Sequence, residues 1–160
     1  MHLKASALFM ISAAGFSAGN ASAFDVNGFR SGASLEAALK LLRERSDQVS
    51  EIGSASEPQR SFLGTSRGKD SSEAITVCRG QLNSYQYDVA GGMRTFVRMV
   101  QTEQAASGPG AGQALSRETS AGEWSTVNFK WSKDTDQKEL GYSYISGEQV
   151  YVRYTAGTCQ

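Results

Sequence analysis

The chain has 160 residues, which is enough for one domain or for two small, closely packed units. Its 16 basic and 16 acidic side chains cancel, and both signs are interspersed along the sequence, so a broad cationic face for binding nucleic acid is not expected. No apolar segment beyond residue 23 approaches the length of a transmembrane helix, and we therefore expect the mature chain to be soluble.

The first 23 residues have the three-part pattern of a secretory signal peptide. Met1–Lys4 is a short basic start, Ala5–Ala18 is an apolar run, and residues 21–23 form a small-residue cleavage site. This pattern predicts cleavage after Ala23 and a periplasmic or secreted location for residues 24–160. Cleavage would also remove His2, the only histidine, and leave the mature chain without an imidazole group.

The two cysteines, Cys78 and Cys159, are expected to form a disulfide, because exported proteins fold in an oxidising compartment. The bond would close a loop of about 80 residues, and the restricted entropy of the unfolded chain would stabilise the fold by roughly 4 kcal/mol. A redox-active pair is the alternative, but it usually needs C-x-x-C spacing and a lowered thiol pKa. The separation of 81 positions favours the structural disulfide.

The first half of the mature chain predicts one helix followed by three strands. Ser34 is a good N-cap, and apolar side chains follow it at helical spacing, at Leu35, Ala38, Leu39 and Leu42. Three strands are then expected in stretches separated by Gly, Pro and Ser, namely Val49–Ile52, Ser61–Leu63 and the longer alternating run Ala74–Val89.

The second half predicts the same order. Gly91 and Gly92 interrupt the chain, and Met93–Gln104 then has helical spacing of its apolar residues. Residues 105–113 are expected to form a flexible loop, because they contain Ser107-Gly108-Pro109-Gly110. Three alternating strands follow, which contain residues 127–131, 140–144 and 150–154, with a hairpin turn at Ser146-Gly147 between the last two.

Helices and strands that do not alternate singly predict an α+β fold, in which an antiparallel sheet is packed by one or two helices. The order of elements allows a tandem helix-plus-three-strand unit, with residues 24–90 and 91–160 as possible subunits of a single domain. No residue-level repeat accompanies this division.

The segment Phe24–Glu36, followed by an amphipathic helix, resembles the entry to the small SmpA/BamE-like and beta-lactamase-inhibitor-protein-like domains of exported bacterial proteins. In that group a strand and a Gly-x-Ser-type turn, here Gly32-Ala33-Ser34, lead into a helix that packs on an antiparallel sheet. The resemblance implies a non-catalytic envelope protein that works by protein–protein contact. The assembly members carry a lipidated cysteine after the signal, and the inhibitor members have two disulfides. This chain has neither feature, so the resemblance carries over the fold but no functional residue.

Several familiar catalytic and metal-binding devices are not expected in residues 24–160. Ser-His-Asp triads, Cys-His pairs and histidine zinc sites require an imidazole group that the mature chain lacks. Gly64–Asp70 is one residue short of a phosphate-binding loop and has Asp70 where Ser or Thr should bind magnesium. Asp134 and Asp136 lack the glycine and distal glutamate of a calcium loop and are expected at a charged hairpin tip. We therefore expect no metal and no cofactor.

Aromatic residues of the C-terminal half are the best candidates for a binding site. Tyr151 is in opposite phase to Val150 and Val152, so Tyr151 and Arg153 are expected on the solvent-facing side of one strand. Trp124 is the third candidate, since exposed Trp, Tyr and Arg are favoured interface anchors. The alternative is that these aromatic side chains fill the core and form cross-strand pairs of a small sheet.

Together these observations predict an exported, non-enzymatic binding or envelope-associated protein. Its expected partner is another protein or an envelope component, contacted through a sheet face or through a loop over residues 105–122. Two alternatives stay open. One is a small carboxylate-dependent hydrolase acting on a glycan, which would need two acids about 5–10 Å apart. The other is a purely structural envelope protein with no discrete site.

Overall fold

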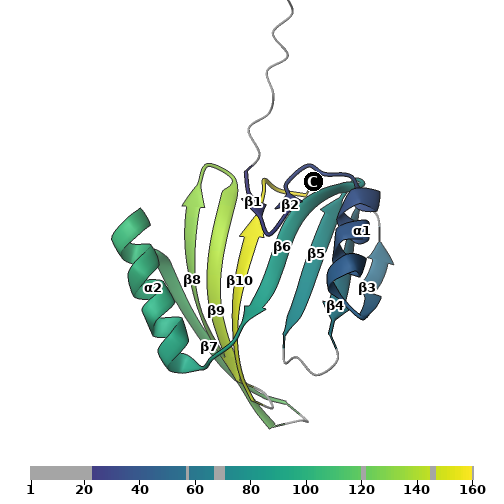
Figure 1. Cartoon of the computed structure of the whole chain (residues 1–160). Coiled ribbons are helices and arrows are strands. Elements are labelled where there is room, and N and C mark those ends of the chain that lie inside the picture. Colours follow the sequence, from purple (N-terminus) through teal and green to yellow (C-terminus); the bar gives the residue numbers. More distant parts are fainter. Residues whose placement is uncertain (1–22, 57, 67–70, 120–121, 145–146, 160) are drawn as a thin grey trace, which may run out of the picture.

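The computed structural model describes residues 23–56, 58–66, 71–119, 122–144 and 147–159. Residues 1–22 of the predicted signal peptide lie outside the described residues. Within the described part, two helices and ten strands follow one another (Figure 1). Their bounds are β1 Asp25–Val26, β2 Phe29–Arg30, α1 Leu35–Arg45, β3 Gln48–Ser56, β4 Gln59–Thr65, β5 Ser72–Cys78, β6 Gln81–Val89, α2 Met93–Ser107, β7 Ala111–Thr119, β8 Gly122–Lys133, β9 Asp136–Tyr144 and β10 Glu148–Thr155. No helix among these residues is long and apolar enough to cross a membrane.

Eight of these strands form one antiparallel sheet in the order β3-β4-β5-β6-β10-β9-β8-β7, and β1 and β2 form a separate hairpin. Strands β3 to β6 make one meander and strands β7 to β10 make another, and the two meet where β6 pairs with β10. Helix α1 precedes the first meander and α2 precedes the second. We call α1 through β6 the first unit and α2 through β10 the second unit. The predicted α+β fold with an antiparallel sheet and two helices is confirmed.

Both helices lie on the same face of the sheet. Residues directly opposite each other in an antiparallel pair point to the same side, and β6 places Tyr85 opposite Tyr154 and Tyr87 opposite Val152. Tyr85 belongs to the core under α1, whereas Val152 belongs to the core under α2. Figure 1 shows α1 over the β4–β5 side and α2 beside β8 and β9. No helix of the described residues lies on the other face of the sheet, and we call it the open face.

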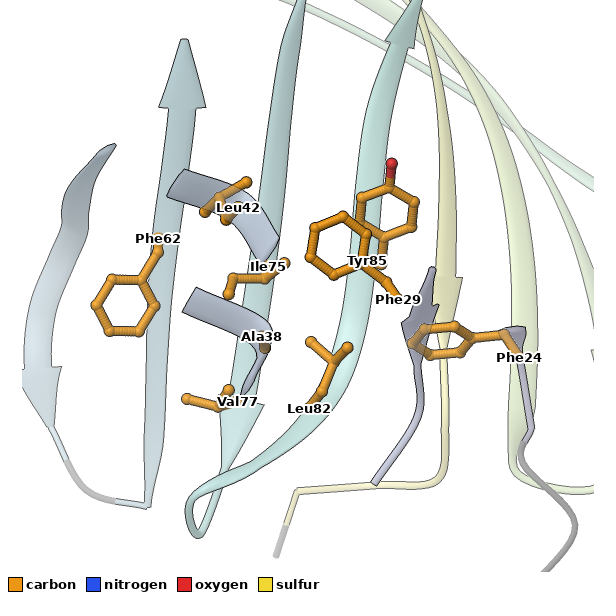
Figure 2. Close-up of a cluster of buried hydrophobic side chains, with 9 residues drawn as sticks. All are labelled: Phe24, Phe29, Ala38, Leu42, Phe62, Ile75, Val77, Leu82 and Tyr85. Carbon is orange, nitrogen blue, oxygen red and sulfur yellow. The ribbon is translucent and has the colours of Figure 1, made fainter. Parts of the chain in front are cut away.

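Helix α1 begins and packs as its sequence predicts. The Ser34 hydroxyl accepts a hydrogen bond from the Ala37 N–H at 3.2 Å, which caps the first turn. Ala38 and Leu42 then point at Ile75 in the sheet (Figure 2). Gly64 allows this close approach, because a Cβ atom there would lie 2.8 Å from the Leu42 side chain.

Helix α2 covers a second, smaller core. Phe96 and Val100 pack on three buried strand residues, Leu140, Val150 and Val152. The helix begins at Met93 as predicted but continues to Ser107, beyond the expected end at Gln104.

The prediction of three strands per unit is wrong, because each unit has four. In the first unit the run Ala74–Val89 contains both β5 and β6, joined by a tight turn at Arg79-Gly80 in which both residues have positive φ (50° and 78°). In the second unit α2 runs to Ser107 and Ala111–Thr119 is strand β7, so residues 105–113 and 105–122 do not form the loops that the sequence predicts. A partner contact through this segment stays a prediction. Side chains 111–118 are exposed on both faces of β7, so its sequence lacks the alternation that marks a half-buried strand.

The hairpin between β8 and β9 has the predicted charged tip. The two strands pair up to Lys133 and Asp136, and Asp134 at the tip has a positive φ of 54°. Strands β9 and β10 also pair as a hairpin, although turn residues 145–146 lie outside the described part of the chain.

The predicted disulfide joins Cys78 to Cys159, whose Cα atoms lie 5.6 Å apart. Cys78 ends β5 in the first unit, and Cys159 follows β10 in the second. The bond therefore ties the end of the chain back to the first unit, and it uses both cysteines.

Candidate functional site

The open face carries different side chains in the two units. In the first unit it is mostly small and hydroxyl-bearing, and the strand register places on it Ser50, Ser61, Thr65, Ser72, Thr76 and Ser84. In the second unit the register places Trp124, Tyr151 and Arg153 on it, together with several charged and amide groups. The three binding candidates from the sequence thus share one face of one unit.

Tyr151 lies on the open face because β10 alternates. Val150 and Val152, on either side of it, are each 1% exposed and belong to the core under α2. Tyr151 pairs with Gly141 of β9, and a Cβ atom on Gly141 would lie 2.0 Å from the ring carbon Cζ of Tyr151. The ring therefore lies flat across the glycine, and Tyr151 is half-buried where the sequence predicts a solvent-facing side chain.

Beside this ring, the carboxylate of Glu139 is buried in the open face, with only 6% of the residue exposed. Its Oε1 accepts hydrogen bonds from the Tyr151 hydroxyl at 2.8 Å and from Asn128 Nδ2 at 3.2 Å. Its Oε2 lies 3.5 Å from Lys130 Nζ and 3.9 Å from Arg153 Nη1. Four donors thus surround one acid, which is how proteins accommodate a buried charge. Glu139 therefore holds the side chains of Tyr151, Asn128, Lys130 and Arg153 in place through hydrogen bonds and ion pairs.

The environment of Tyr151 also affects its ionisation. Burial of the phenol raises the pKa of Tyr151 to about 12, and the negative charge of Glu139 adds to this effect. Tyr151 is therefore a neutral hydrogen-bond donor at physiological pH.

Arg153 is held in place by the strands on both sides of β10. Its Nε and Nη2 donate to Oε1 of Gln86 in β6, at 2.9 and 2.6 Å. Its guanidinium carbon lies 5.5 Å from the centre of the Tyr151 ring, within range of a cation–π interaction. Arg153 therefore contacts both the seam between the units and the cluster around Glu139.

Trp124 lies farther out on the open face, in β8 next to the edge strand β7. The guanidinium of Arg117 stacks 4.5 Å from the centre of its ring. Trp124, Tyr151 and Arg153 line one shallow hollow with a volume of about 240 Å³, together with Leu115, Asn128 and Lys130. The structure thus brings all three predicted residues to one hollow, which is large enough for a single side chain.

The residues at the centre of this hollow were missed by sequence reasoning. Glu139, Lys130 and Asn128 come together only through the register of β8 and β9, in which Lys130 pairs with Glu139 and Asn128 pairs with Gly141. The two-residue turn at Asp134-Thr135 is the signal that could have found them, because it determines which residues of the hairpin face each other.

A larger cleft of about 640 Å³ lies on the helix side, near the end of α2. Aromatic residues Phe24, Trp131 and Tyr154 line it, and an ion pair between Glu103 and Lys138 crosses it. Partial burial opposes ionisation of Glu103, but the hydrogen bonds from Lys138 and Ser107 outweigh it and lower the pKa of Glu103. The carboxyl group is therefore a paired anion and not a proton donor at neutral pH.

Among the described residues, no group of three or more His, Cys, Asp or Glu side chains is placed to hold a metal ion. Comparisons with protein-family models, with curated proteins and with solved structures found no match. The resemblance of Phe24–Glu36 to small exported bacterial domains thus stays a prediction.

Proposed function

We propose that this protein is an exported, non-enzymatic binding module, and that the open face of its second unit contacts an acidic surface of another protein. The observation that carries the proposal is the hollow that Trp124, Tyr151 and Arg153 line together with the buried Glu139. The N-terminal sequence pattern and the disulfide support the exported location. The resemblance of the entry segment implies the same kind of role.

The composition of this surface supports a protein partner. Trp, Tyr and Arg are the residue types that most often dominate binding energy at protein interfaces. Here Tyr151 and Arg153 are already held by Glu139 and Gln86, so little side-chain entropy is lost when a partner binds.

The charge of the surface supports an acidic partner. Among the described residues, the open face of the second unit carries Arg117, Lys130 and Arg153 against the single acid Glu139. Because Glu139 is buried among its own donors, the accessible charge is positive.

The alternative of a glycan hydrolase has weaker support. Such an enzyme needs two carboxyl groups, one of which stays protonated near neutral pH. The open-face hollow is lined by one acid, Glu139, which four donors surround. In the helix-side cleft, Glu103 has a lowered pKa and is paired with Lys138. These features favour binding over acid–base catalysis.

The proposal is tested in two steps. The partner is first captured with purified protein from the exported fraction of the source cells and identified. Its affinity is then measured by calorimetry for the wild type, Tyr151→Ala and Arg117→Ala, with Arg43→Ala as the matched control, because Arg43 is an exposed arginine on α1. We expect the open-face variants to bind at least about tenfold more weakly and the control to be unchanged. Failure to recover a partner under any condition, or equal affinity in all four proteins, would contradict the proposal.

A further inference from the structure

Strand β7 is an unusually regular edge of the sheet. It is the last strand in the sheet order, and its register with β8 runs without a break over nine residue pairs, from Ala111 to Thr119. Side chains 111–118 are exposed on both faces. A long, uninterrupted edge strand of this kind is a template on which another strand can pair.

Features that usually protect an edge are scarce in β7. The strand contains no proline and no lysine, and its charged residues, Arg117 and Glu118, are confined to one end. The opposite edge strand, β3, differs because its register with β4 shifts between Ile52 and Ser56. Such irregularities make an edge a poor template. The edge that is open to strand addition is therefore β7.

We propose that β7 pairs antiparallel with β7 of a second copy of this chain, about a two-fold axis at Leu115. Leu115 is the midpoint of the strand, so this register overlaps all nine residues. It is also 48% exposed, which makes it one of the largest exposed apolar side chains among the described residues. The sheets of two copies then join into one continuous sheet.

The sequence of β7 is self-complementary in this register. Arg117 lies opposite Gln113 of the second copy, Glu118 lies opposite Gly112, and Ser116 lies opposite Ala114. Thus no two like charges meet, and each charged residue faces an amide or a residue without a side chain. On the axis, Leu115 of one copy lies directly opposite Leu115 of the other. Directly opposite side chains are the closest neighbours across an antiparallel pair, so the two leucines would be in contact.

The pairing surface is one strand edge with its flanking side chains, which is smaller than a standard stable interface. We therefore expect a concentration-dependent equilibrium between monomer and dimer. Leu115 also lines the hollow on the open face. In the dimer the two hollows would therefore lie on the same face of the continuous sheet, one on each side of the paired β7 strands. The dimer does not require the partner protein, so the two proposals can fail separately.

The test is sedimentation velocity of the purified protein alone, over a wide concentration range. The wild type should shift from the monomer toward the dimer as its concentration rises. Leu115→Arg and Leu115→Glu should each weaken association at least about tenfold, because like charges then meet on the axis. An equimolar mixture of the two variants should restore the dimer, because the introduced arginine then faces the introduced glutamate.

The matched control is Ile52→Arg at the midpoint of the other edge strand, where Ile52 is 42% exposed. This variant should dimerise like the wild type. A monomer at every concentration, a mixture that stays monomeric, or an equal loss in Ile52→Arg would each overturn the proposal. At a concentration low enough for the wild type to be monomeric, circular dichroism and the urea midpoint should match the wild type in all variants, since both side chains are exposed.

Discussion

At the scale of single residues, Tyr151 owes its position to two residues of the neighbouring strand β9. Gly141 leaves room for the ring, and Glu139 accepts the hydroxyl hydrogen bond at 2.8 Å. Neither contact depends on a bound partner. The geometry of the candidate site is therefore built into the sheet and present before binding.

We predict that Gly141→Ala displaces the Tyr151 ring, since the new Cβ would lie 2.0 Å from ring carbon Cζ. The expected loss is about 1–3 kcal/mol in the free energy of unfolding, as for other overpacked sites. Urea denaturation measures it. In a Tyr151→Ala background the same substitution should be nearly neutral, because the obstructing ring is gone. An equal loss in both backgrounds would show that the ring is not the obstacle.

At the scale of elements, α2 obtains its N-terminal cap from a distant strand. Gly92 provides no side chain, and the Glu148 carboxylate at the start of β10 accepts from the Met93 N–H at 3.4 Å. The same oxygen accepts from the Tyr142 hydroxyl at 2.9 Å. A negative charge at this end of a helix is also favoured by the helix dipole. Glu148 thus joins α2 to the sheet through a cap.

We predict that Glu148→Gln lowers the free energy of unfolding by roughly 0.5–1 kcal/mol, because the charge that interacts with the helix N-terminus is lost. Thermal or urea denaturation measures the change. Glu118→Gln, at an exposed acid in β7, is the matched control and should leave stability unchanged. Equal effects of the two substitutions would contradict a capping role for Glu148.

What could be predicted at this scale depended on how local each signal was. Helix α1 was predictable because its cap, Ser34, and its apolar residues lie within a dozen positions of each other. The opposite phase of Tyr151 and Val152 was predictable because alternation is also local. In contrast, β7 has no buried face, so burial leaves no alternating pattern in its sequence.

The candidate site was only half predictable for the same reason. Tyr151 and Arg153 could be selected from one strand, but Glu139 is buried only because β8, β9 and β10 align side by side. A sequence with 16 acids offers no local reason to select this one. The position of Glu139 at the centre of the site therefore depends on the register of β8, β9 and β10, which the sequence of one strand does not show.

At the scale of the whole molecule, both units contain tyrosines whose pKa is raised by their surroundings. Burial, with smaller contributions from neighbouring groups, raises the pKa of five of them, which are Tyr85, Tyr87, Tyr142, Tyr151 and Tyr154. A raised pKa means that folding favours the neutral phenol. This contribution to stability is complete below the ordinary tyrosine pKa of about 10 and is lost as pH rises through the folded-state values.

We therefore predict that the free energy of unfolding falls as pH rises above about 10. Urea denaturation at pH 8 and at about pH 11 measures the loss, and Tyr151→Phe should lose less between the two conditions than the wild type. A wild-type urea midpoint that is the same at both values would contradict the raised pKa values.

The position of β10 has a consequence for how the chain reaches its final form. This strand is the last in sequence, yet it lies between β6 and β9 at the middle of the sheet. During synthesis from the N-terminus, the four strands of the first unit can pair once residue 89 has emerged, but β6 remains an open edge until β10 arrives. Completion of the sheet and closure of the disulfide both wait for residues 148–159. The order of folding is thus set by the placement of its final strand, and a chain truncated before β10 would lose the pairing that joins its two halves.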